Sequence, residues 1–463
     1  MRAALLALAL LLAGCLGAQT PPPPAGPGTP SPPVGAGPAG MTFSAPMLID
    51  DVRAGGEPVI AITHNGVIIV SAHPGYTHLH NPGDPTDLPD EALLPTTGQS
   101  YLWRSLDQGK TWQTIGTPNA PMGDGPRGTE PGVSDPDMTV TSSNRVYHTD
   151  LEALASASVG WSDDDGATWL MGNPVASGGA VDRQWLASID DTVYFTANYF
   201  SDHRVLRSTD GVTWQRLGDT QCGGDFVGAP DGTLYAACGA GVSTSEDGGM
   251  TFEVRAIPDH DGGGITEPAV DGAGNVWVAW LEGRNALWAA GSPDKGKTWP
   301  WQHNLTGAVH DVVAPNETEP PMLVFPWVSA GSAGRIAVST FAGAGSEASA
   351  DTQNWSVVSV AVFGADTNAS AAQGYMIYPG DHLGLICRGG TGCQVGSMQG
   401  DAASDRRLGD FFETTIDKDG FLHLTFANTS VHPADWISHP AYVRQVDGPR
   451  FLADGDTFEP LQG

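Results

Sequence analysis

The chain has 463 residues, with 61 glycines, 36 prolines and a formal net charge of −31 from 52 acidic and 21 basic side chains. So large a negative charge argues against a nucleic-acid partner and favours solubility and cation binding. The many glycines suit short strands joined by tight turns. The composition therefore favours an all-β protein.

Residues 1–15 have the features of an export signal. Arg2 supplies the positive start, and residues 3–13 form an apolar run that is too short to span a membrane. The run ends in Leu-Ala-Gly-Cys, which resembles a lipobox, in which Cys15 becomes the lipidated first residue of the mature chain. We expect an exported protein anchored by acyl chains to the outer face of the membrane. A secreted form, cut near Ala18, is the alternative.

Residues 16–40 consist almost entirely of Pro, Gly, Ala, Ser and Thr. This composition cannot bury a core and predicts an extended, semi-stiff linker. No later apolar run is long enough for a transmembrane helix. We expect the linker to hold one folded domain, residues 41–463, away from the membrane.

A turn motif of the pattern S-x-D-x-G-x-T-W recurs along this domain. The Asp carboxylate can accept hydrogen bonds from its own turn, and Gly supplies a positive φ. Thr begins the next strand, and the aromatic ring is expected to pack against the neighbouring sheet. The copies occupy residues 105–112, 162–169, 208–214, 245–252 and 292–299. Repeats spaced by tens of residues predict a solenoid or a propeller.

The motif resembles the Asp box, or BNR repeat, of the β-propeller superfamily that includes the sialidases. The resemblance implies a propeller whose Asp boxes are architecture at the outer rim. Sialidase activity would further need three arginines around the substrate carboxylate, a Tyr–Glu nucleophile pair and an Asp acid/base. The family's Arg-Ile-Pro motif is absent here, since residues 51–58 read DVRAGGEP. The resemblance therefore predicts the fold and leaves the function to other residues.

A second repeat consists of an acidic residue, a short apolar strand, a turn and another apolar strand. Seven such units follow one another, and in the first five the turn motif comes after the second strand. Residues 355–363 supply a third strand to unit six. We predict seven four-stranded blades, with a six-bladed sialidase-type ring as the alternative. Residues 41–49 should close the ring by pairing with residues 441–446 as the outer strand of the last blade.

The first strand of each blade lines the central channel of a propeller, so the acidic residues that begin these strands are expected at one mouth of the channel. They are Glu57, Asp135, Asp182, Asp225, Glu267, Glu319 and Asp410. Each carboxylate can accept hydrogen bonds from the backbone of the neighbouring blade. Alternatively, carboxylates this crowded can bind a cation, for which Ca²⁺ is the candidate.

Basic and aromatic side chains are expected at the same mouth. Arg183, Arg406 and Arg407 would either neutralise the carboxylates or form a fork that binds an anion such as a sugar carboxylate. Because Arg406 and Arg407 are adjacent, both cannot readily grip one carboxylate. Trp185 and Tyr199 are expected to offer a stacking face to a sugar.

The chain has five cysteines, and four remain if Cys15 is lipidated. Four cysteines in an exported protein suit disulfides. Cys222 and Cys238 bracket a predicted hairpin and should meet across it. Cys387 and Cys393 could close a small loop.

Two functions fit these expectations. The favoured one is a membrane-tethered, extracytoplasmic propeller that binds a glycan or protein ligand at the channel mouth without catalysis. The alternative is an exo-acting glycoside hydrolase, a sialidase or another, that uses carboxylates and arginines of the mouth. In an enzyme, one or two carboxylates would be essential, whereas in a binding protein many substitutions would each weaken the affinity slightly.

Overall fold

The structure of the protein is a computed structural model. It describes residues 35–36, 40–51, 55–73, 100–115, 135–152, 156–170, 172, 174–177, 180–200, 202–262, 267–344, 355–367, 371–382, 408–432 and 437–456. Several predicted features lie outside these residues, namely the export signal with Cys15, Arg406, Arg407 and the pair Cys387 and Cys393.

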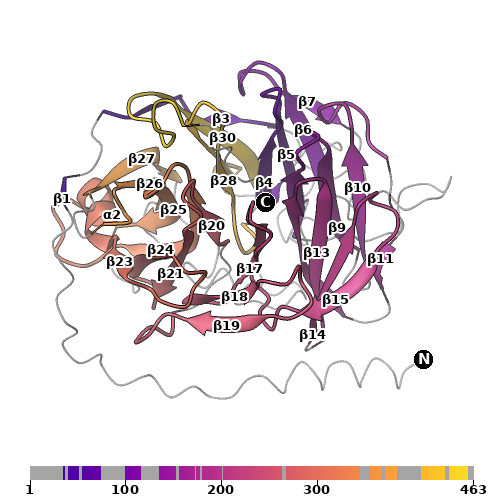
Figure 1. The fold of residues 1–463 in the computed structure, drawn as a ribbon. Helices are drawn as coiled ribbons and strands as arrows, with labels where there is room; N and C mark the ends of the chain where they lie inside the picture. Colours follow the sequence, from indigo (N-terminus) through magenta and orange to yellow (C-terminus); the bar gives the residue numbers. More distant parts are fainter. Residues whose placement is uncertain are drawn as a thin grey trace, which may run out of the picture. The chain divides into compact units, whose positions relative to one another are not determined.

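The strands form seven sheets, which are the blades of a ring (Figure 1). Within each blade, strands that follow one another in the chain pair antiparallel from the innermost strand outward, as short connections favour. This is the seven-bladed β-propeller that the repeats predict, and the six-bladed alternative is wrong.

The first four blades take their strands in chain order. Blade 1 is β4 (Gly56–Ile62), β5 (Ile68–His73), β6 (Tyr101–Ser105) and β7 (Gln113–Ile115). Blade 2 is β8 (Asp137–Val140), β9 (Val146–Glu152), β10 (Ser156–Ser162) and β11 (Pro174–Ser177). Blade 3 is β12 (Val181–Ile189), β13 (Thr192–Tyr199), β14 (Asp202–Ser208) and β15 (Gln215–Asp219). Blade 4 is β16 (Phe226–Gly228), β17 (Leu234–Ala237), β18 (Gly241–Ser245) and β19 (Glu253–Ala256).

The next two blades follow the same plan. Blade 5 is β20 (Ala269–Val270), β21 (Val276–Glu282), β22 (Ala286–Ser292) and β23 (Trp301–Asn304). Blade 6 is β24 (Met322–Ala330), β25 (Arg335–Gly343), β26 (Trp355–Phe363) and β27 (Ala371–His382), with β1 (Gly35–Ala36) paired parallel to β27 at its outer edge. Residues 35–36, which lie in the expected linker, therefore add a short strand to blade 6.

The ring closes in blade 7, where the segment that precedes blade 1 supplies the outer strands. This blade contains β28 (Thr414–Ile416), β29 (Leu422–His432) and β30 (Ile437–Asp447), and both β2 (Thr42–Phe43) and β3 (Met47–Leu48) pair antiparallel with β30. Leu48 lies opposite Ala441, so the predicted closure is confirmed. Closure covers what would otherwise be a free sheet edge on β30.

A helix, α2 (Thr306–Val313), follows blade 5 and packs against β26 and β27 of blade 6. Its Val309 is buried in the core between the two blades. The sequence reading did not predict this helix, because an isolated two-turn helix depends on tertiary packing for its stability. In the part of the chain that the structure describes, no helix is long and apolar enough to cross a membrane.

The five repeated turns form the hydrogen bonds that their sequence predicts. In the first turn, the backbone N–H and the hydroxyl of Thr111 donate to Asp107 at 2.8 and 2.7 Å, and Gly109 N–H donates to Ser105 Oγ at 2.8 Å. The bonds from Thr111 lower the pKa of Asp107 to about 2. The other four turns repeat the arrangement, which joins the third and fourth strands of a blade. Because strand direction alternates, these turns lie at the opposite face from the starts of the innermost strands.

The glycine of each turn has a second role, since it lies against the preceding blade. Gly109 has a φ of +80°, and a Cβ added there would lie 2.1 Å from a ring carbon of Tyr442 in blade 7. At Gly166 in blade 2, the same atom would lie 2.6 Å from Ile69 of blade 1. The motif therefore contributes to the contact between blades as well as to the turn.

The aromatic residue of the motif packs into the core between blades. Trp112 contacts Tyr442 of the neighbouring blade, with ring centroids 5.3 Å apart. Trp214 contacts Phe195 of its own blade at 6.1 Å and also packs against a core cluster that contains Tyr147 and Trp161 of blade 2. The expected packing between blades therefore holds at both turns, and Trp214 adds a contact within its own blade.

Gly109→Ala should destabilise the propeller by about 2–4 kcal/mol, because a strained φ costs about 1 kcal/mol and the clash with Tyr442 adds about 1–3 kcal/mol. Gly66→Ala is the matched control, since Gly66 also has a φ of +80° but has nothing within 4 Å of an added Cβ. Chemical denaturation of the two variants measures the difference. Equal losses of unfolding free energy would show that the glycine does not contribute to packing between blades.

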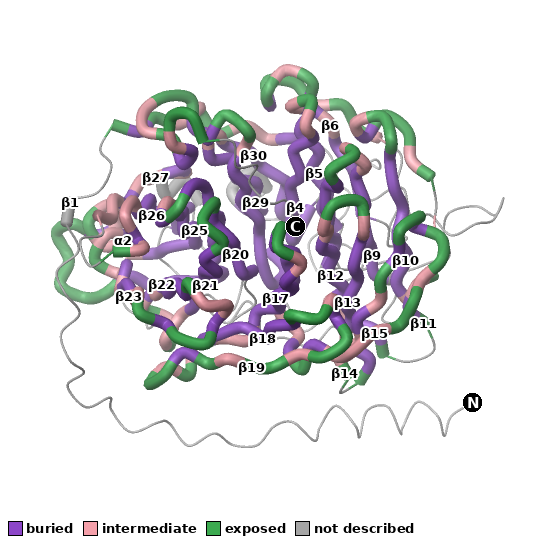
Figure 2. The backbone as a smooth tube through the Cα atoms, viewed as in Figure 1, coloured by how far each residue is buried: buried purple, intermediate pink, exposed green. Residues whose placement is uncertain are grey.

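Burial increases toward the ring's centre (Figure 2). The innermost strands β4 and β24 are buried along their whole length, whereas the outer strands β7 and β19 are half-buried or exposed. At the centre, the ring of Phe411 lies 5.1 Å from that of Trp185 and 5.7 Å from that of Trp327. These three side chains come from blades 7, 3 and 6, so they meet across the channel. We call them the aromatic plug.

Candidate functional site

The channel mouth is the face at which the innermost strands begin, and Glu57 organises it. Its Oε2 accepts a hydrogen bond from Asp135 N–H at 2.8 Å, and its Oε1 accepts one from Asp410 N–H at 2.7 Å. Asp135 Oδ2 in turn accepts a hydrogen bond from Arg183 N–H at 3.2 Å. These bonds connect blades 7, 1, 2 and 3. They agree with the interpretation that the first carboxylate of a strand bonds the backbone of the next blade.

The mouth carboxyls are close enough to influence one another. Burial raises the pKa of Asp135 well above its usual value, and the charges of Glu57, Asp182 and Asp410 raise it further. Arg183 acts in the opposite direction. Asp135 therefore holds a proton more readily than an exposed aspartate does.

Backbone bulges at the mouth set the direction of these side chains. The pairing of β12 with β13 shifts between Asp182 and Trp185, and Arg183 has a φ of 49°. The pairing of β4 with β5 shifts between Gly56 and Val59, and Glu57 has a φ of 46°. A bulge interrupts the alternation of side chains along a strand, so the mouth residues do not follow the simple two-residue period.

The predicted stacking faces are not available to a ligand. Trp185 is fully buried in the aromatic plug, and its Nε1 donates to Gly223 C=O at 3.2 Å. Tyr199 is 6% exposed, and the guanidinium of Arg204 lies 4.1 Å from the centre of its ring. Both expectations are corrected for the same reason, which is that neighbouring side chains already cover the rings.

The predicted ring of seven carboxylates divides into different environments. Glu319 lies in the segment before β24 and is exposed, so it does not belong to the buried set. Asp182 is half-buried at the mouth, beside Asp135. Asp225 and Glu267 are buried beyond the mouth, where their charges interact.

Two buried carboxylates of this inner layer, Asp137 and Glu413, were not singled out from the sequence. Asp137 Oδ2 accepts a hydrogen bond from Leu186 N–H at 2.5 Å, and Glu413 Oε2 accepts one from Ile60 N–H at 2.9 Å. Burial raises the pKa of Asp137 to about 8. A signal was present, since each residue follows a predicted mouth acid, Asp135 or Asp410, by two or three positions.

A hollow of about 320 Å³ opens at the mouth beside blades 3 and 4, and we call it the mouth pocket. It is lined by Arg183, Asn198, His203, Gln221, Gly223, Gly224, Ala237, Gly239 and the disulfide between Cys222 and Cys238. The predicted pairing of these two cysteines is confirmed. Of the predicted binding residues, the pocket takes in Arg183. No motif in the sequence pointed to Asn198, His203 or Gln221, which come from separate segments.

Polar contacts fix the walls of the mouth pocket. His203 Nδ1 is hydrogen-bonded to Asn198 Oδ1, and Gln221 Nε2 donates to Phe252 C=O at 2.8 Å. Burial lowers the pKa of His203, and Arg183 lowers it further while Asp219 opposes the shift. His203 is therefore neutral at pH 7, and the permanent positive charge of the pocket comes from Arg183.

Asp150 should make the protein less stable as the pH rises through neutrality. It lies on β9, accepts a hydrogen bond from Ser100 N–H at 2.7 Å, and has its pKa raised by burial from 3.8 to about 7. A folded pKa above the unfolded value stabilises the protein below about pH 4, and this contribution is lost as the pH rises through about 7. Asp150→Asn should therefore reduce the change of the unfolding free energy with pH by on the order of 4 kcal/mol at most.

Denaturant unfolding at a series of pH values measures how the unfolding free energy of Asp150→Asn changes with pH. Asp51→Asn is the control, because Asp51 is exposed. The wild type and the control should lose stability between about pH 4 and 7, and the Asp150 variant should lose less. Parallel curves for all three proteins would contradict the prediction.

Several solved structures are similar to this chain at low sequence identity. No protein-family model matches the chain, and no curated protein matches it. An α-L-arabinanase of Penicillium chrysogenum complexed with arabinobiose is 14% identical, with 88% of this chain and 98% of that chain covered and a TM-score of 0.45. The intramolecular trans-sialidase of Ruminococcus gnavus in complex with oseltamivir carboxylate is 14% identical, with 89% and 97% covered and a TM-score of 0.42. YCF48 bound to D1 peptide is 9% identical, with 90% and 100% covered and a TM-score of 0.48.

These structural neighbours include glycoside hydrolases and a chain bound to a peptide. A fold can host many functions, so such likenesses do not decide between an enzyme and a binding protein. The distinction between an enzyme and a binding protein must therefore rest on the side chains at the channel mouth of this chain.

Proposed function

We propose that this protein is an exported, membrane-tethered propeller that binds a glycan or protein ligand at its channel mouth without catalysis. The mouth pocket is the observation that supports this function. Its volume of about 320 Å³ suits a single sugar ring or one side chain of a protein partner. The guanidinium of Arg183 and the side chains of Asn198 and His203 suit a carboxylate or hydroxyl groups.

One feature supports ligand binding, and a second argues against catalysis. The pocket wall is held by the disulfide between Cys222 and Cys238, and a rigid pocket loses little freedom when a ligand binds. At the mouth, both carboxylate oxygens of Glu57 already accept backbone hydrogen bonds. A carboxylate so engaged is poorly placed to act as a nucleophile or a base.

The proposal is tested by screening the purified chain on a glycan array that includes acidic glycans. Arg183→Ala should weaken binding by about tenfold or more, because the loss of a charge-assisted hydrogen bond costs about 1.5–3 kcal/mol. Arg207→Ala is the control. Arg207 lies near the end of β14, away from His203 at its start, and donates a hydrogen bond to Gln215. Equal affinities of the Arg183 variant and the wild type would show that the mouth pocket does not bind the ligand.

A glycoside hydrolase is the second candidate, and the raised pKa of Asp135 is the observation that favours it. A carboxyl that retains its proton near neutral pH can act as a general acid. Hydrolysis of a fluorogenic sialoside by the wild type, lost in Asp135→Asn, Asp182→Ala and Arg183→Ala, would make the protein an enzyme. An inactive wild type, assayed with and without Ca²⁺, would remove sialidase activity from consideration.

The tether is proposed from the sequence, in which Cys15 ends an apolar run. Cys15→Ser should move the protein from the membrane fraction to the soluble fraction of the expressing bacterium, because acyl chains would no longer be attached. Immunoblots of the two fractions measure this change. An unchanged distribution would show that Cys15 does not anchor the chain.

A further inference from the structure

Buried carboxylates from several blades meet in the channel, beyond the mouth. Asp137 of blade 2, Asp225 at the start of blade 4 and Glu413 at the start of blade 7 each present a carboxylate oxygen, and these oxygens lie within 4.8 Å of one another. We call these residues the acidic cluster. They are 0%, 0% and 3% exposed, respectively. Glu267, which leads into blade 5, is close enough for its charge to act on Asp225 and Glu413.

Backbone N–H groups donate hydrogen bonds to only some of the carboxylate oxygens of the acidic cluster. Asp225 Oδ1 accepts a hydrogen bond from Phe226 N–H at 2.5 Å, and Glu413 Oε2 accepts one from Ile60 N–H. Asp225 Oδ2 and Glu413 Oε1 are buried without a hydrogen-bond partner. Among the described residues, no Lys, Arg or His forms an ion pair with the cluster. Buried carboxylates in this position need protons or a cation.

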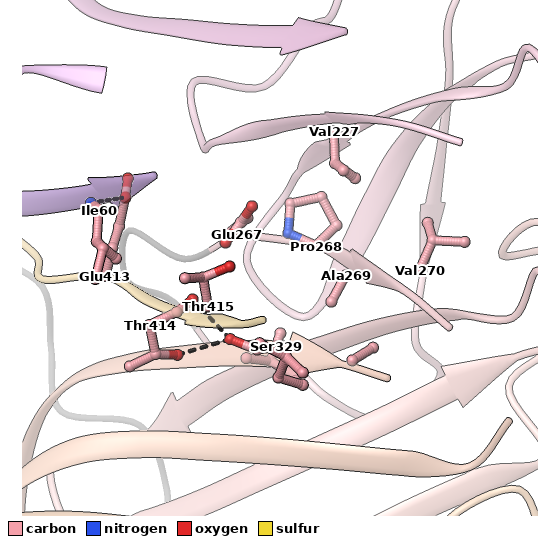
Figure 3. A pocket seen from close by; sticks show the side chains of 13 residues that line it. Ile60, Val227, Glu267, Pro268, Ala269, Val270, Ser329, Glu413, Thr414 and Thr415 are labelled. Carbon is pink, nitrogen blue, oxygen red and sulfur yellow. Dashed lines mark hydrogen bonds between the residues drawn. The ribbon is translucent and has the colours of Figure 1, made fainter. Parts of the chain in front are cut away.

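A small cavity adjoins the acidic cluster at Glu413 and contains a further buried polar atom without a partner. Its volume is about 20 Å³, and Glu267, Glu413 and Thr415 are among the residues that line it (Figure 3). A polar cavity of this size accommodates about one water molecule or small ion. Thr415 does not belong to the acidic cluster, yet its Oγ1 is also buried without a hydrogen-bond partner, and the residue is 5% exposed.

We propose that the acidic cluster binds a hard divalent cation, with Ca²⁺ as the best match. Asp137, Asp225 and Glu413 would supply carboxylate oxygens, and Glu267 and Thr415 line the adjoining space. Ca²⁺ takes six to eight oxygen ligands in flexible geometry, whereas Mg²⁺ demands six in a near-ideal octahedron. The ion offsets the repulsion between the carboxylates and joins strands from different blades, so its role is to stabilise the ring. The proposal does not depend on the function of the mouth pocket.

Metal content and metal-dependent stability of the wild type test the proposal directly. The full chain, purified without chelator, should contain about one equivalent of metal by mass spectrometry after acid digestion. Refolding from denaturant with EDTA should lower the thermal midpoint, and refolding with Ca²⁺ should restore it. A parallel refolding with Mg²⁺ identifies the preferred ion. A metal-free wild type whose midpoint does not respond to either ion would overturn the proposal.

Amide variants distinguish a cation from protons. Asp225→Asn and Glu413→Gln keep the shape of the side chain but remove charge, so each should abolish metal binding and the response to Ca²⁺. Glu319→Gln, at an exposed carboxylate, should retain both. If the cluster holds only protons, the amides imitate the protonated acids, and the two variants should equal or exceed the wild type in stability in every buffer.

Discussion

Deletion of residues 41–50 should destabilise the propeller by about 6 kcal/mol, because this segment closes the ring. Met41 and Ile49 are 6% and 7% exposed, and the burial of each contributes about 2 kcal/mol. The N–H groups of Ser44 and Ile49 donate to the carbonyls of Arg444 and Pro440 at 2.8 Å, and each bond adds about 1 kcal/mol. The thermal midpoint of unfolding measures the loss.

A second deletion controls for the effect of shortening the chain. Removal of residues 19–40 takes away β1, whose Gly35 and Ala36 pair with β27, but leaves the closure of blade 7 intact. This variant should have a midpoint close to that of the wild type. Equal midpoints for the two deletions would show that β2 and β3 do not hold the ring closed.

Phe411→Ala should cost about 3–5 kcal/mol of unfolding free energy, the usual loss for a buried aromatic residue. Phe411 is 1% exposed and contacts both other rings of the aromatic plug, Trp185 and Trp327. Its removal would leave a cavity in the channel that the rigid blades cannot easily close. Denaturant unfolding followed by tryptophan fluorescence measures the change, since two of the three rings are indoles.

The matched control is Phe200→Ala, because Phe200 is 78% exposed. A surface substitution of this kind usually changes stability by less than about 0.5 kcal/mol. If the two variants lose similar amounts of free energy, the plug does not contribute to the stability of the ring.

The sequence predicted most of the fold because the signals are local. A turn such as residues 105–112 satisfies its own backbone through Ser105, Asp107 and Thr111, so it forms wherever the motif occurs. The closing segment, residues 41–49, was predicted because the first repeat left it without a partner. The helix α2 and the strand β1 were missed, since both depend on contacts with distant parts of blade 6.

The candidate site was predicted less completely. The sequence placed Glu57, Asp135 and Asp410 correctly at one end of the innermost strands. There, the backbone N–H groups of Asp135 and Asp410 donate hydrogen bonds to the carboxylate of Glu57. It did not separate the mouth from the deeper layer that contains Asp225. It also treated Trp185 as exposed, whereas the shift in pairing between Asp182 and Trp185 accompanies its burial in the plug.

By itself, the sequence determined the class of fold, the number of blades and the closure of the ring, because turn chemistry and the periodicity of strands act over short stretches of chain. Only the tertiary structure decided which side chains meet in the channel. Asp137, Asp225 and Glu413 come together because seven twisted blades converge on one axis, and residues far apart in the chain are adjacent there. Bulges at Glu57 and Arg183 then turn individual side chains toward the mouth or the core, and no repeat in the sequence encodes that choice.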